Sequence, residues 1–188
     1  MFERQRINKD NLSTYLNSQG CRSRIIGNIL PLLQVDYGDA NDCTLVSITT
    51  VIHFWFPSID VSAIYNQVET IAKEYGYSMN GTPSNTIKTI YQESLNAFKI
   101  PYRARSKYLK GVGFTWNFIK ENFDRSNIPI ILNIWKDGRN YYHNHTVLII
   151  GYVESKNKKM LAVYDNWFKD ISYIDYNKLN TICSIQYI

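Results

Sequence analysis

Residues 41–55 read NDCTLVSITTVIHFW, a run of apolar and small residues that begins with a polar turn. The run is longer than about eight residues, where strands usually stop, so its length predicts a helix. Its many β-branched residues favour a strand instead, and periodicity cannot decide for a continuous apolar run. We expect a helix, and a helix that is apolar on every side must be buried in the middle of the fold.

A cysteine stands where this helix should begin. Asn41 or Asp42 can accept a hydrogen bond from the free amides of the first turn, which places Cys43 at or beside the helix N-terminus. There the peptide dipoles favour negative charge, and the thiolate is the reactive form of cysteine. A lone cysteine is more often a small buried hydrophobe. A catalytic role for Cys43 therefore depends on partners elsewhere in the chain.

Composition narrows the class of protein. The chain has 188 residues, of which 45% are hydrophobic, so we expect one globular domain over residues 1–188. Its three cysteines, Cys21, Cys43 and Cys183, form neither a disulfide framework nor a zinc-binding spacing, and we expect no metal and no cofactor. The net charge of +5 is spread over small clusters, which favours solvated surface over nucleic-acid binding.

The same totals bear on location and partners. No run of 18 apolar residues occurs, so we expect no membrane span. The charged residues at the N-terminus are not followed by an apolar signal region, so we expect a cytoplasmic protein, or a secreted one if a leader has been removed. We expect a monomer whose partner is a peptide or protein substrate.

Helical patterns dominate the first half of the chain. We expect helices over residues 3–19, 61–75, 83–98 and 115–123, with Thr82 and Pro83 as N-cap and first position of the third. Residues 24–34 look like an extended lead-in or edge strand, and residues 101–113 look irregular.

The second half has the period of strands. We expect them at 128–135, 143–154, 160–165, 171–174 and 181–188, with turns at 136–139 and 156–159. Helices followed by meandering strands predict an α+β fold with a mainly antiparallel sheet.

Two residues of the strand half could activate the cysteine. His145 precedes one apolar run and Asp165 ends the next strand, and the short turn between these strands predicts a hairpin. The two residues would then meet at one rim of the sheet, as the base and the group that orients it. His143 is a rival to His145, because residues two apart share a face of a strand. Asn166 is a rival to Asp165.

Three short motifs carry a family resemblance: Asn41-Asp42-Cys43 opening a helix, HTVLIIGY at residues 145–152 and VYDNW at residues 163–167. Together they resemble the papain-like cysteine peptidases, and most closely the compact bacterial forms similar to bacteriocin-leader peptidases. The resemblance implies a papain-like fold in which a central buried helix packs on the sheet. It also implies that Cys43 is the nucleophile, His145 the base and Asp165 the third residue.

The implied reaction is cleavage of a peptide or amide bond through a thioester. The family uses a glutamine ahead of the cysteine to hold the oxyanion, and Gln34 is the nearest candidate, with Asn41 as a substitute. Trp167 and His143 are candidates for contacting substrate. Two alternatives stay open: an acyltransferase or transglutaminase-like enzyme on the same residues, and an inactive papain-fold binding module.

Overall fold

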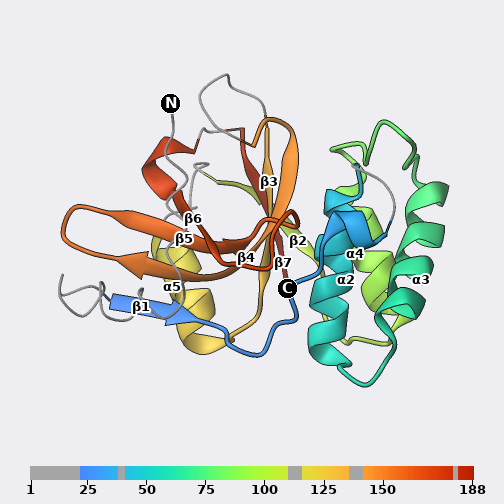
Figure 1. Cartoon of the computed structure of the whole chain (residues 1–188), viewed down its shortest axis with the longest axis horizontal. Coiled ribbons are helices and arrows are strands. Elements are labelled where there is room, and N and C mark those ends of the chain that lie inside the picture. The colour runs from blue at the N-terminus through green and yellow to red at the C-terminus, as the bar shows by residue number, and fades with distance from the viewer. Residues whose placement is uncertain (1–21, 38–40, 110–115, 136–141, 180–181) are drawn as a thin grey trace.

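The computed structural model describes residues 22–37, 41–109, 116–135, 142–179 and 182–188. Three helices lie together on one side and a sheet lies on the other, so the predicted α+β class is confirmed (Figure 1). One cluster of buried apolar residues runs through both halves, from Leu45 and Ile48 of the helices to Val147 and Ile185 of the sheet. No helix in the described ranges has the length and hydrophobicity needed to cross a bilayer.

The helical half is built around the quoted stretch. Helix α2 (Cys43–Trp55) is buried continuously from Thr44 to Ile52, as its all-round apolar sequence predicts. Helix α3 (Val61–Glu74) packs an apolar stripe against it, and the Asp60 side chain caps α3 by accepting from the Ala63 amide at 3.0 Å. The left-handed backbone of Gly76 (φ 86°) follows the end of α3.

The third helix begins later than we predicted. Helix α4 (Ile87–Ala97) follows Thr86, so the N-cap assignment for Thr82 and Pro83 is wrong. The carbonyl of Pro83 accepts from the amide of Thr86 at 3.1 Å and from its hydroxyl at 2.9 Å. These bonds close a separate turn, and the helix can start only after it.

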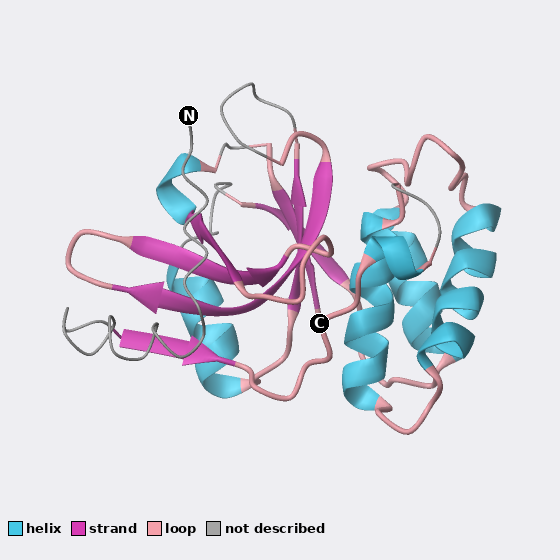
Figure 2. Ribbon diagram, viewed as in Figure 1, coloured by secondary structure: helices cyan, strands magenta, loops and turns pink. Residues whose placement is uncertain are grey.

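The sheet has seven strands, and every pairing among them is antiparallel within the described residues (Figure 2). Six follow the spatial order β2-β7-β3-β4-β5-β6, and β1 pairs with β4. The bounds are β1 (Arg22–Ile25), β2 (Arg105–Tyr108), β3 (Ile130–Ile134), β4 (His145–Glu154), β5 (Lys159–Tyr164), β6 (Ser172–Asp175) and β7 (Ser184–Tyr187). Two short 3-10 turns, η1 (Gln34–Asp36) and η2 (Tyr176–Lys178), complete the elements.

Some strand predictions need correction. Strand β2 lies in a segment that we expected to be irregular. Its four residues are all exposed, so the sequence shows no alternation that would indicate a strand. Of the lead-in at 24–34, only Arg24 and Ile25 belong to a strand, and the amide of Ile26 adds one further bond to the Ile150 carbonyl of β4 at 2.9 Å. The predicted helix at 3–19 and the turn at 136–139 lie outside the described residues.

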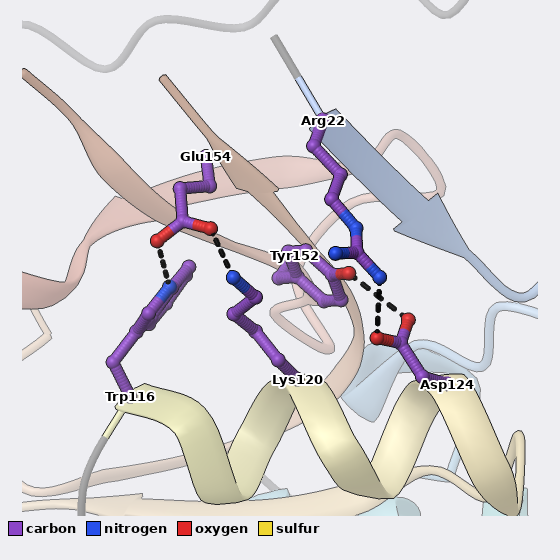
Figure 3. A network of polar contacts seen from close by, with 6 residues as sticks. All are labelled: Arg22, Trp116, Lys120, Asp124, Tyr152 and Glu154. Atoms are coloured by element: carbon purple, nitrogen blue, oxygen red, sulfur yellow. Dashed lines mark hydrogen bonds and ion pairs between the residues drawn. The ribbon is translucent and has the colours of Figure 1, made fainter. Parts of the chain in front are cut away.

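Helix α5 (Trp116–Arg125) lies on the sheet and is fastened there by two carboxylates (Figure 3). Asp124 accepts from Arg22 of β1 at 2.7 Å and from the Tyr152 hydroxyl at 3.0 Å. Glu154 accepts from the Trp116 indole at 2.7 Å and pairs with Lys120. Trp116, Lys120 and Asp124 are spaced four residues apart, so they share one face of the helix. The network therefore joins α5, β1 and the end of β4.

Candidate active site

Cys43 is the first residue of α2, as predicted, and its side chain is partly exposed. Asp42 occupies the N-cap position, but its side chain makes no capping hydrogen bond, so the capping role considered for it is wrong. The buried carboxylate of Asp42 accepts instead from the hydroxyls of Tyr65 and Tyr77. The amides and the dipole at this helix end still favour a negative charge on the sulfur.

His145 is the first residue of β4 and is 5% exposed. The β4–β5 hairpin forms as predicted, with Leu148 opposite Tyr164 and a bulge between Ile149 and Gly151. This register brings the imidazole Nε2 of His145 to 2.7 Å from the main-chain carbonyl oxygen of Asp165. A carbonyl can only accept, so Nε2 carries the hydrogen. The neutral ring then has its lone pair on Nδ1, where it can take a proton.

Asp165 thus orients the imidazole through its main chain, whereas the sequence suggested its side chain. Its buried carboxylate accepts from the hydroxyls of Ser172 at 2.8 Å and Tyr142 at 3.2 Å. It also accepts from the amides of Trp167 at 3.1 Å and Phe168 at 3.2 Å. The carboxylate therefore holds the turn that presents the carbonyl to His145.

Aromatic rings shield the imidazole. The Trp167 ring stacks on the His145 ring with centroids 4.1 Å apart, and the nearly parallel Tyr142 ring lies 5.6 Å from it. His143 is outside the strand in which we placed it. It is exposed, in the turn before β4, with a left-handed backbone (φ 35°).

Asn166, considered only as a rival to Asp165, joins the two halves of the fold. Its buried amide Nδ2 donates to the Cys43 carbonyl at 3.1 Å, the Ser47 hydroxyl at 2.9 Å and the Thr146 carbonyl at 3.0 Å. A left-handed backbone (φ 61°) aims it there, a conformation that asparagine tolerates better than most residues. Asn166 therefore links the start of α2 to the start of β4.

The two candidate oxyanion donors lie differently. Gln34 is buried in η1, and its main-chain amide donates to the Asn166 carbonyl at 2.9 Å. This bond places Gln34 beside the residue that holds the start of α2. Asn41 is exposed, and its side-chain amide donates to the Met79 carbonyl at 2.6 Å.

The electrostatics of the site favour a neutral pair at rest. Burial raises the pKa of the Cys43 thiol, although hydrogen bonds from the amides and hydroxyls of Thr146 and Thr44 oppose the rise. Burial also lowers the pKa of His145 to about 4, against the raising effects of the Asp165 carbonyl and charge. Near neutral pH, the site therefore holds an uncharged thiol at the start of α2 and an uncharged imidazole at the start of β4. Because Thr146 directly follows His145, its bonds to the sulfur bring Cys43 close to the start of β4.

Thr146 and Thr44 were not identified from the sequence as site residues. Their only signal was position, since each directly follows a proposed catalytic residue. Among the described residues, no group of three or more His, Cys, Asp or Glu side chains could hold a metal ion.

Comparisons with known proteins bear on this site. The sequence profile of the Peptidase_C39 like family matches residues 26–185. A comparison with curated proteins found no match. One similar solved structure is digestive procathepsin L 3 from the larval midgut of Tenebrio molitor, with 13% identity, a TM-score of 0.54 and coverage of 88% of this chain and 68% of that one.

Two further solved structures are similar. Digestive procathepsin L2 proteinase of the same insect has 13% identity and a TM-score of 0.51, with 91% of this chain and 65% of that chain covered. A double glycine motif protease from an AMS/PCAT transporter, solved with its leader peptide, has 12% identity and a TM-score of 0.46, with 86% and 95% covered. The cathepsin structures show that the fold is papain-like.

Proposed function

The chain belongs to the Peptidase_C39 like family, and from this premise we propose that it cleaves a peptide or amide bond with Cys43 as nucleophile and His145 as base. The observation that supports this most is that the first residues of α2 and of β4 lie close together. The Cys43 sulfur accepts from Thr146, whose neighbour His145 has its Nε2 fixed on the Asp165 carbonyl. That bond leaves Nδ1 as the proton acceptor.

The reaction follows from these groups. His145 removes the thiol proton as the sulfur attacks the substrate carbonyl, and the carbonyl oxygen becomes an oxyanion. The Cys43 amide and Gln34 hold the oxyanion. His145 then gives the proton to the leaving amine, and water hydrolyses the thioester. Asp165 is the third member of the set, because it fixes the tautomer and direction of the ring.

The remaining predicted site residues surround this centre. Trp167 shields the imidazole with one face, and its half-buried position leaves part of the indole for the substrate. His143 projects from the turn next to His145 and is exposed. We assign both to substrate contact. Exclusion of water by the aromatic rings strengthens the polar interactions of the site.

The test is cleavage of a mixed peptide library, read by mass spectrometry. Cys43→Ala should abolish every product that the wild type forms. The matched control is Cys183→Ala, because Cys183 is the second free cysteine among the described residues and lies fully buried directly before β7. Equal cleavage by Cys43→Ala and the wild type would remove Cys43 from the mechanism.

One observation favours a second candidate, a papain-fold binding module. Burial raises the pKa of Cys43 and lowers the pKa of His145, and both shifts disfavour a thiolate–imidazolium pair at rest. A module of this kind should bind peptides from the same library without cleaving them. Retention of intact peptides by both the wild type and Cys43→Ala would select it.

A further inference from the structure

Four polar side chains form a buried chain across the middle of the molecule. Gln186 of β7, Asn133 of β3, Thr146 of β4 and Thr44 of α2 are each at most 3% exposed. Gln186 Nε2 lies 3.1 Å from Asn133 Oδ1, and Asn133 Nδ2 lies 2.9 Å from Thr146 Oγ1. Thr146 Oγ1 lies 2.9 Å from Thr44 Oγ1. The chain ends at the first turn of α2.

Burying this row of hydrogen-bonded side chains costs free energy that an apolar core would not. Asn133 is fully buried in a strand whose other residues are isoleucine and leucine. A buried amide is unfavourable unless it is hydrogen-bonded, and an apolar side chain would suit the core. The polar residues therefore point to a role beyond packing.

The donors in the chain point one way. Gln186 donates to Asn133, and Asn133 donates to the Thr146 oxygen. The Thr146 oxygen accepts from Asn133, and its single hydrogen is left to donate to Thr44 or to Cys43. If that hydrogen goes to Cys43, the sulfur receives it directly. If it goes to Thr44, the Thr44 hydroxyl is left to donate to the sulfur, which both hydroxyls reach. Either arrangement brings one hydroxyl hydrogen to Cys43.

We propose that Thr146, together with Thr44, donates a hydroxyl hydrogen bond that stabilises the Cys43 thiolate as His145 takes its proton, and that Asn133 and Gln186 are positioning residues that fix its direction. The inference rests on the proposed function and deepens it. Burial disfavours the Cys43 thiolate at rest, so the reaction needs groups that stabilise it when it forms. Donors already aimed at the sulfur lower the free energy of that state without any rearrangement.

The test uses iodoacetamide, which alkylates thiolates, with the modified cysteine identified by mass spectrometry. Thr146→Val keeps the shape of the side chain and removes its hydroxyl. A hydrogen bond to a charged group is roughly twice as strong as one between neutral groups, so without it the pH profile of Cys43 alkylation should shift upward by about one unit or more. At pH 8 the rate should fall about tenfold. Thr146→Ser should restore the wild-type profile.

Two further variants complete the design. Asn133→Leu should shift the profile in the same direction without touching the sulfur. The matched control is Thr50→Val, because Thr50 is an equally buried threonine of α2 whose hydroxyl donates to the Val46 carbonyl at 2.8 Å. Its profile should equal that of the wild type.

An unchanged profile in both Thr146→Val and Asn133→Leu, with thermal unfolding showing that they fold, overturns the proposal. If Thr146→Val does not fold, Thr44→Val and Asn133→Leu decide by the same criterion. Alkylation does not require peptide cleavage. A shifted profile with no cleavage would therefore overturn the peptidase function alone, whereas cleavage with an unshifted profile would overturn this inference alone.

Discussion

Asp165 shows that one residue can serve a site through two different groups. Its carbonyl orients His145, and its carboxylate accepts from two amides of the turn that follows it and from the hydroxyls of Tyr142 and Ser172. Sequence reasoning found the residue, because strand pairing determines which residues meet at a rim. It assigned the wrong group, because the direction of a side chain at a strand end depends on the turn that follows.

We therefore expect Asp165→Asn and Asp165→Ala to differ. Asparagine keeps an oxygen for the two amides and leaves the main-chain carbonyl in place, so kcat/KM should stay within a few-fold of the wild type. Alanine removes all four hydrogen bonds. It should lower the free energy of unfolding by about 3 kcal/mol and kcat/KM by more than tenfold. Equal losses in peptide cleavage for both variants would show that the negative charge itself is needed.

The choice between the oxyanion donors can be tested in the same assay. Gln34→Ala should lower kcat by about 10²-fold, the usual effect of losing one such donor. Asn41→Ala should change kcat only slightly, because the Asn41 amide is bound to the Met79 carbonyl. The reverse order of effects would assign the role to Asn41.

Among the elements, β1 depends on a single glycine of β4. A Cβ built on Gly151 would lie 2.1 Å from the Arg24 carbonyl oxygen and 2.7 Å from the Ile25 Cα. Both are backbone atoms, so β1 would have to move away and would strain the bond between Arg22 and Asp124. The bulge that ends at Gly151 falls at the same point. A larger residue should therefore detach β1 from the sheet.

Gly151→Ala should lower the free energy of unfolding by roughly 2 kcal/mol, measured in urea. The matched control is Gly27→Ala, because a Cβ built there meets nothing within 4 Å. That variant should stay within about 0.5 kcal/mol of the wild type. A Gly151→Ala protein as stable as Gly27→Ala would show that β1 contributes little to the fold.

The elements also show where local pattern was sufficient. Helix α2 formed despite its β-branched residues, because burial on all sides outweighs intrinsic propensity. The long strand β4 and its hairpin partner β5 also agreed with their apolar runs. Strand β2 could not be predicted, because its exposed residues carry no alternation and only pairing with β7 makes it a strand. Helix α4 begins later than predicted because Pro83 and Thr86 close a separate hydrogen-bonded turn before it.

In the molecule as a whole, burying His145 between the two halves makes stability depend on pH. Burial lowers the pKa of His145 to about 4, whereas an unfolded histidine titrates near 6.5. Between these values the unfolded chain binds a proton that the folded chain does not, so stability falls as pH falls. The full contribution of the neutral ring is present above pH 6.5.

Between pH 6.5 and 4.5 we expect this residue to reduce the free energy of unfolding by about 2–3 kcal/mol. Urea unfolding of the wild type and of His145→Gln at both pH values isolates the effect, since the variant should lose that part of the slope. His143→Gln leaves the buried imidazole in place and is the control. Parallel slopes for the wild type and His145→Gln would contradict a buried neutral ring.

The sequence by itself determined the elements and the residues with reactive groups: a buried helix that begins at Cys43, strands that bring His145 and Asp165 to one rim, and an α+β fold. These follow from patterns within some ten to twenty residues, where periodicity and chain length act. Only the tertiary structure decided how those groups are used: the carbonyl of Asp165, the link through Asn166, and the chain from Gln186 through Asn133 to Thr146 and Thr44. These are hydrogen bonds between segments far apart in the chain, and their direction is set by which buried donors and acceptors meet once the halves pack together.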